Sequence, residues 1–144
     1  MQTKVFISKL DDQRIVASIV AAEKNTSGEI RVCISDRKHD DALVAAQKRF
    51  ERIGMTKTRD RNGVLIYFVP LSQKFAVIGD AGIHEKCGAD FWRGLTDEMH
   101  DLLQVDRFTD AVILAVEKVG RALAEYFPRR PDDANELSNR IVSD

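Results

Sequence analysis

Residues 60–70 have the sequence Asp60-Arg61-Asn62-Gly63-Val64-Leu65-Ile66-Tyr67-Phe68-Val69-Pro70. Seven consecutive apolar or aromatic residues, Val64 to Pro70, follow a polar loop and lack the alternation of a half-exposed strand. A strand that is apolar on both faces must be covered on both faces, so this run predicts the central strand of a layered α/β sheet. Gly63 and Pro70 bound the run, which is too short for a buried helix.

Two further strands are predicted around this one. Residues 74–78 follow after a link of three residues, Leu71 to Gln73, which is short enough to require a hairpin and hence an antiparallel pair. Upstream, residues 29–34 alternate apolar with other side chains, as in a strand with one buried face. A helix over 42–53 lies between that strand and the central one, which predicts a βαβ unit with parallel strands.

The remaining chain is predicted to be mainly helical. Ser8, with Asp11 three residues later, predicts the start of a helix of about 15 residues. Helix caps are expected at Asp40 or Asp41 and at Asp80, and a last helix ends before Pro128. The fold class is therefore α/β, with a small mixed sheet of three to four strands (βαβ plus hairpin) and helices on both faces. We expect one domain over residues 1–128 and a polar, flexible tail over 129–144.

Composition excludes several classes of protein. The 144 residues are 31% charged and 44% hydrophobic, with a net charge of −1. A general nucleic-acid or membrane-surface binder normally carries a basic excess, so no nucleic-acid partner is expected. No run of apolar residues suggests a signal peptide or a membrane insertion, which predicts a cytoplasmic protein. Cys33 and Cys87 have neither metal-ligand spacing nor the number needed for a disulfide framework.

The topology brings three polar loops together. If the first two strands are parallel, their starts share one edge of the sheet with the end of the returning hairpin strand. Loops 26–29, 59–62 and 79–82 should therefore converge there. We expect a site at this edge.

The residue types at this edge favour a hard metal ion. Glu29, Asp60 and Asp80 supply the carboxylate oxygens that Ca²⁺ or Mg²⁺ prefers. Asn62 could add a neutral oxygen, and Gly79 would let the backbone approach an ion or ligand closely. The other candidate ligand-binding residues are Arg61 and His84, the latter one helical turn after Asp80.

Other interpretations of the same residues remain open. Asp80 suits a helix cap, Asp60 could be neutralised by its flanking arginines, and Glu29 could pair with an arginine. Arg59 and Arg61, with amides near Gly79, could instead hold an anion. Open α/β sheets usually bind ligands at the carboxyl ends of their parallel strands, where residues 36–41 form a competing site or a solvated helix entry.

Several segments resemble the TPM domain family. They are Thr26-Ser27-Gly28-Glu29-Ile30-Arg31-Val32, Arg61-Asn62-Gly63-Val64-Leu65-Ile66, Ile78-Gly79-Asp80-Ala81-Gly82-Ile83 and Asp90-Phe91-Trp92. They occur in the family's order, and the resemblance covers about residues 8–127. The chain most resembles the short soluble bacterial branch, whose members lack a signal peptide and a transmembrane helix and end in an acidic tail.

The resemblance implies a compact α/β domain. Family members include a thylakoid protein with acid phosphatase activity and others that bind Ca²⁺ or related ions. The family's recognisable positions match Asn62-Gly63 and Gly79 here, and its acidic site maps onto Asp60, Asp80 and Glu29. The resemblance therefore implies divalent-cation binding, with weak phosphatase activity of a metal-dependent or acid type. The alternative is a non-enzymatic interaction module, in which the tail 129–144 docks a protein partner.

Overall fold

A computed structural model describes residues 1–129 and 141–143 of the chain. The elements in chain order are α1 (Thr3–Ser8), α2 (Asp12–Glu23), β1 (Glu29–Ile34), α3 (Ala42–Arg52), β2 (Gly63–Val69), β3 (Lys74–Gly79), α4 (Ala81–Cys87), α5 (Ala89–Gln104), α6 (Phe108–Tyr126) and β4 (Val142–Ser143). Short 3-10 turns cover Met55–Lys57 and Pro70–Ser72.

The strands form one mixed sheet in the order β3-β2-β1-β4. β1 and β2 are parallel, with Glu29 opposite Gly63. β2 and β3 are antiparallel, with Phe68 opposite Phe75. All seven residues of β2 are buried, as its unbroken apolar run predicts. The predicted βαβ unit, the hairpin and the fold class are confirmed.

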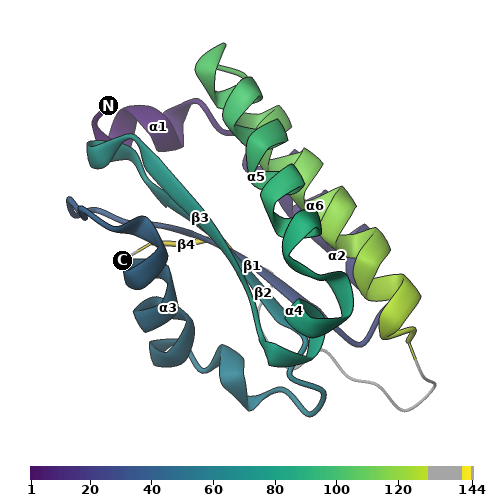
Figure 1. The fold of residues 1–144 in the computed structure, drawn as a ribbon. Coiled ribbons are helices and arrows are strands. Elements are labelled where there is room, and N and C mark those ends of the chain that lie inside the picture. Colours follow the sequence, from purple (N-terminus) through teal and green to yellow (C-terminus); the bar gives the residue numbers. More distant parts are fainter. Residues whose placement is uncertain (130–140, 144) are drawn as a thin grey trace.

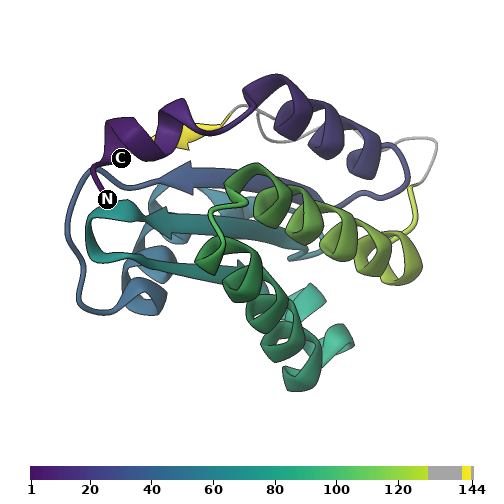
Figure 2. The same cartoon turned by 90° about the horizontal axis from the view of Figure 1, so that it is seen from above.

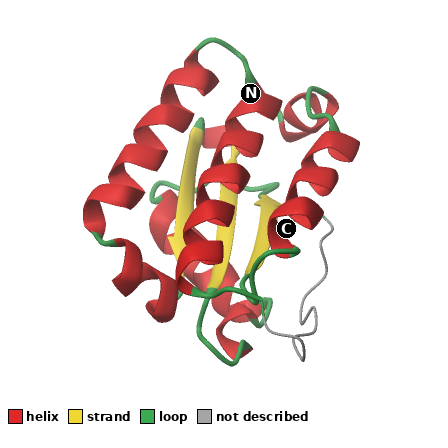
Figure 3. Ribbon diagram, turned by 90° about the vertical axis from the view of Figure 1, so that its right-hand side faces the viewer, coloured by secondary structure: helices red, strands yellow, loops and turns green. Residues whose placement is uncertain are grey.

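Helices cover both faces of the sheet. Figure 1 shows α3 on one face and the layer of α2, α5 and α6 on the other, and Figure 3 looks onto that layer with the strands behind it. Ile30, Val32 and Ile34 of β1 point into the larger core under α2, α5 and α6, whereas Cys33 packs under α3. This alternation follows from the two-residue period of a strand, so β1 is buried on both sides.

The predicted start of the first long helix is wrong. Ser8 ends α1, and the chain breaks before Asp11, whose side chain accepts a hydrogen bond from the backbone N–H of Arg14 at 3.2 Å. Asp11 is therefore the N-cap of α2. α1 was not predicted, and its Phe6 ring lies 5.2 Å from the rings of both Phe68 and Phe108, which anchors this short helix on the core.

α6 spans 19 residues, and its buried side carries nine of them. Its outer side is polar, with Glu117 and Arg121 exposed. No helix within residues 1–129 and 141–143 combines the length and the apolar character that crossing a membrane requires.

Most of the predicted tail lies outside the described residues. Its described part, Val142–Ser143, forms β4 and pairs parallel with β1, with Val142 opposite Cys33. Figure 2 shows β4 beyond β1, on the side of the sheet away from β3. This end of the chain therefore adds a short fourth strand.

Candidate site at the amino end of the parallel strands

The three predicted loops meet at one edge of the sheet. The Ser27 hydroxyl donates to Asp60 Oδ2 at 3.4 Å, which joins the loop before β1 to the loop before β2. The backbone N–H of Gly82 donates to the Arg61 carbonyl at 2.8 Å, which joins the start of α4 to the same loop. The backbone N–H of Asp80 donates to the Gly63 carbonyl at 2.9 Å. The convergence predicted from topology is therefore present.

Asp80 and Arg61 form the strongest ion pair of this edge. Arg61 donates Nε to Oδ2 at 2.7 Å and Nη2 to Oδ1 at 2.8 Å, a bidentate geometry. The same carboxylate accepts the backbone N–H of Ala81 at 2.8 Å, so Asp80 caps α4 as its alternative interpretation predicted. Its hydrogen bond and negative charge raise the pKa of Arg61. Both charges are balanced within the protein, which weakens the case for an anion bound by Arg61.

Asp60 lies in a different environment. Its side chain is 29% exposed and contacts Ser27 from the neighbouring loop. Asn62 Nδ2 donates to the same Ser27 hydroxyl at 3.1 Å, and the Asn62 residue is almost fully buried. The backbone N–H of Asn62 donates to the Thr58 hydroxyl at 3.3 Å, which holds the turn in place. The Arg59 guanidinium also lies close, with its Nε 4.0 Å from Asp60 Oδ2, so a flanking arginine does pair with this acid. The partly exposed Asp60 carboxylate thus has one cationic neighbour, Arg59, and two neutral oxygen-bearing ones, Ser27 and Asn62.

Glu29 is buried beside a second acid. It opens β1 with 2% exposure, next to Glu23 at the end of α2, which is 5% exposed. Glu23 Oε2 accepts the backbone N–H of Ile30 at 2.8 Å. Burial, and after it the neighbouring Glu29, raise the pKa of Glu23 to about 8, although the Ile30 hydrogen bond opposes the shift. Near neutral pH this pair therefore keeps a proton on Glu23.

Glu23 was not among the predicted site residues. The sequence contains a signal for it, because Ile15, Ile19 and Glu23 recur every four residues and share the buried face of α2. An acid at such a position must be protonated or paired. Arg129 Nη1 donates to the Glu23 carbonyl at 2.9 Å and adds a positive charge close by.

Gly79 and His84 belong to the surroundings of Trp92. A Cβ on Gly79 would lie 2.7 Å from the indole ring, so any larger residue would push Trp92 away from β3. The His84 ring stacks on the same indole, with centroids 5.9 Å apart and planes 8° apart. The structure thus places both residues in a packing arrangement on the α4 side of the edge.

The carboxylates at this edge do not assemble into a ready-made cage. Among the residues that the structure describes, no three His, Cys, Asp or Glu side chains are arranged to hold one metal ion. Glu29 is paired with Glu23, and Asp80 with Arg61. The donor set that fits a hard cation here is one carboxylate, Asp60, with neutral oxygens.

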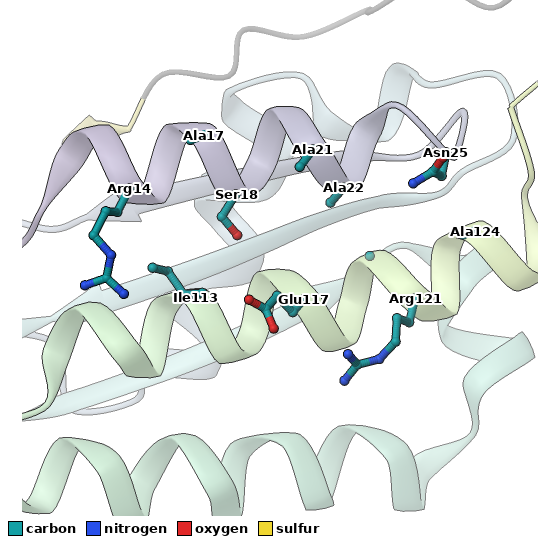
Figure 4. Close-up of a pocket in the computed structure, with 11 residues that line it drawn as sticks. Arg14, Ala17, Ser18, Ala21, Ala22, Asn25, Ile113, Glu117, Arg121 and Ala124 are labelled. Atoms are coloured by element: carbon teal, nitrogen blue, oxygen red, sulfur yellow. The ribbon is translucent and has the colours of Figure 1, made fainter.

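A separate groove of about 700 Å³ runs between α2 and α6. Figure 4 shows small side chains, Ala17, Ala21 and Ala22, along its α2 side, with Glu117 and Arg121 on α6. The two helices approach closely at Gly120, because glycine has no side chain there. An added Cβ would lie only 2.8 Å from Ala22 Cβ. None of the predicted site residues lines this groove.

Comparisons with known proteins agree with this architecture. The sequence model of the TPM domain matches residues 2–122. The NMR structure of BA42 protein from the psychrophilic bacterium Bizionia argentinensis is similar, with 37% sequence identity, a TM-score of 0.84 and 92% of each chain covered. Comparison with curated protein sequences gives no match. The family match spans most of the chain, and on this ground the chain belongs to the TPM domain family.

Proposed function

We propose that this domain binds a divalent cation, Ca²⁺ or Mg²⁺, at the amino end of β1 and β2, with Asp60 as the principal carboxylate. The observation that supports this proposal is that Asp60 and Asn62, in the loop before β2, both contact the hydroxyl of Ser27, in the loop before β1. Carboxylate, hydroxyl and amide oxygens are hard donors, and water completes the shell of Mg²⁺ in many sites. Glu29 and Asp80, the other two proposed acids, lie at the same edge, where the charge of Asp80 is balanced by Arg61 and Glu29 lies beside Glu23.

A thermal-shift experiment tests this proposal. Millimolar CaCl₂ or MgCl₂ should raise the melting temperature of the wild-type chain, because a ligand that binds only the folded state stabilises it by about 2.7 kcal/mol at 100 times its Kd. Asp60→Asn should abolish the rise, since it removes the charge and preserves the shape. The matched control is Asp97→Asn, which removes the same charge from an exposed position on α5; it should respond like the wild type.

An Asp60→Asn variant that still responds fully to the ion places the binding site elsewhere. Asp80→Asn separates two roles, because asparagine can still cap α4 but cannot form the same charged pair with Arg61. We expect Asp80→Asn to lower stability without metal and to retain the metal response.

Phosphatase activity is a second part of the proposal. The name of the matching family model contains the word phosphatase, and a bound cation could polarise a phosphoryl oxygen or activate water. Hydrolysis of an aryl phosphomonoester should then require the added cation and be lost in Asp60→Asn. Hydrolysis that persists in EDTA and in the Asp60→Asn variant would show that the reaction does not require the metal.

A further inference from the structure

A pocket of about 270 Å³ lies at the carboxyl end of β2, where Phe68 and Pro70 line it. Figure 1 shows α1, the turn between β2 and β3, and the connection between α5 and α6 at this same end of the molecule. Ligands of open α/β sheets usually bind at the carboxyl ends of the parallel strands. The volume is just below the usual range of small-molecule sites, about 300–1,000 Å³, so the pocket suits a small ligand.

Phenyl rings form the floor of this pocket. The apolar residues of the floor are Phe6, Phe68, Phe75, Leu103 and Phe108. The Phe68 and Phe75 rings stack, with centroids 6.2 Å apart and planes 27° apart, and Phe6 packs against Phe68 from α1. Because the rings pack against one another, their positions are fixed before a ligand arrives, which lowers the ordering cost of binding. Phe75 and Leu103 are only half-buried, so apolar surface remains for a ligand to cover.

The side of the rim next to the α5–α6 connection is negative. Asp106 is the one carboxylate in the lining, and it forms no ion pair with any residue in the described part of the chain. Its backbone is left-handed, with φ of 61°, and its N–H donates to the Leu103 carbonyl at 3.1 Å. Asparagine adopts this conformation as readily as aspartate, so the turn itself does not require the charge. His100 and Gln104 of α5 add hydrogen-bonding groups on this side.

The side of the rim next to the β2–β3 turn is positive. Lys74, the first residue of β3, lines the pocket, and its ammonium group donates to the Asp40 carbonyl. A carbonyl does not neutralise the charge, and an ammonium group has three N–H donors, so donors remain for a ligand. Met1 also lines the pocket, and its amine donates to the Pro70 carbonyl at 3.3 Å. The rim therefore carries opposite charges on two different elements above an apolar floor.

We propose that this pocket binds a free α-amino acid with an aromatic, apolar side chain. The side chain lies against the phenyl floor through offset or edge-to-face ring contacts. The ammonium group pairs with Asp106 and the carboxylate with Lys74, in charge-assisted hydrogen bonds. A ligand with only one of these charges leaves the other rim group without a partner. The proposal does not depend on the cation site, which lies at the other end of the strands.

Calorimetric titration of the full chain in EDTA tests the proposal, because EDTA keeps divalent cations away from the other proposed site. The probes, at constant ionic strength, are phenylalanine, alanine, phenylpropionate and phenethylamine. Asp106→Asn and Lys74→Gln should each bind phenylalanine about tenfold more weakly, which corresponds to the loss of one charged hydrogen bond. Asp106→Asn should still bind phenylpropionate, and Lys74→Gln should still bind phenethylamine.

The matched controls are Asp101→Asn and Lys86→Gln, which remove the same charges from exposed positions on α5 and α4 outside the lining. Both should bind phenylalanine like the wild type, and thermal unfolding of each variant without ligand confirms that it is folded. Tighter binding of phenylalanine than of the three other probes, weakened only in the two rim variants, supports the site.

Three results would overturn the proposal. Phenylpropionate or phenethylamine that binds as tightly as phenylalanine would show that the two charges are not both recognised, and equally tight binding of alanine would show that the phenyl floor makes no contribution. Equal weakening in the control variants would reduce the effect to general electrostatics. The absence of saturable phenylalanine binding by the wild type at millimolar concentrations would show that the pocket does not take this ligand.

Discussion

Gly82→Ala is expected to lower the free energy of unfolding by about 3 kcal/mol, at the upper end of the effect of overpacking a tight site. Gly82 lies in the first turn of α4, where a Cβ would be 2.3 Å from the Asp60 carbonyl oxygen and 2.7 Å from that of Arg61. Both atoms belong to the backbone, so no side-chain rotation can relieve the clash. The hydrogen bond from Gly82 N–H to the Arg61 carbonyl would have to lengthen. Urea unfolding measures the loss.

Two other glycines provide the comparison. Gly94 on α5 has open space where a Cβ would be added, so Gly94→Ala should stabilise the chain by about 0.5–1 kcal/mol through helix propensity. Gly79→Ala should have an intermediate effect, because its 2.7 Å contact is with the Trp92 ring, a side chain that can shift. If Gly82→Ala is as stable as Gly94→Ala, loop 60–61 is not fixed against α4.

The same substitution should disturb the proposed cation site. Asp60 and Arg61 form the backbone against which Gly82 packs, so a displaced loop moves Asp60 away from Ser27. We therefore expect Gly82→Ala to lose the thermal response to Ca²⁺ or Mg²⁺ as well as stability. Gly94→Ala should keep the response.

Local patterns predicted most of the fold because each pattern has one dominant physical reading. The apolar run of β2 must be covered on both faces, and Asp41 and Asp80 precede apolar helical segments as capping residues do. The choice between Ser8 and Asp11 as a cap was wrong because both residues can accept a hydrogen bond from a helix N-terminus. Packing decided it: Phe6 binds the core as part of a separate α1, which forces a break before Asp11.

The candidate site was predictable in its location and less so in its contacts. The parallel pairing of β1 and β2 brings the loops of Ser27 and Asp60 together, so topology was sufficient to predict where the site lies. Arg61, which pairs with Asp80, adopts a left-handed backbone conformation with φ of 51°, and no sequence pattern indicated this conformation. The proximity of Glu23 to Glu29 depends on the path of loop 24–28, which local patterns do not specify.

Glu23→Gln is expected to stabilise the chain at pH 8 by about 2–4 kcal/mol and to have little effect below pH 5. Burial and the neighbouring Glu29 raise the pKa of Glu23 from 4.5 to about 8 in the folded chain. Between these values the folded chain keeps a proton that the unfolded chain releases. Stability is therefore full below pH 4.5 and falls as the pH rises through about 8.

Glutamine removes this pH dependence and keeps the local hydrogen bonds. Its carbonyl oxygen can still accept the Ile30 N–H, and its amide can donate to the Glu29 carboxylate, so only one negative charge remains in the buried pair. Urea unfolding at pH 5, 6, 7 and 8 should show that the difference in the free energy of unfolding between Glu23→Gln and the wild type grows as the pH rises. Glu85→Gln, at an exposed position on α4, is the control, and its free energy of unfolding should change with pH as that of the wild type does. If the stability of Glu23→Gln has the same pH dependence as that of the wild type, Glu23 is already ionised in the folded chain. The charge of Arg129 must then stabilise the buried pair of acids.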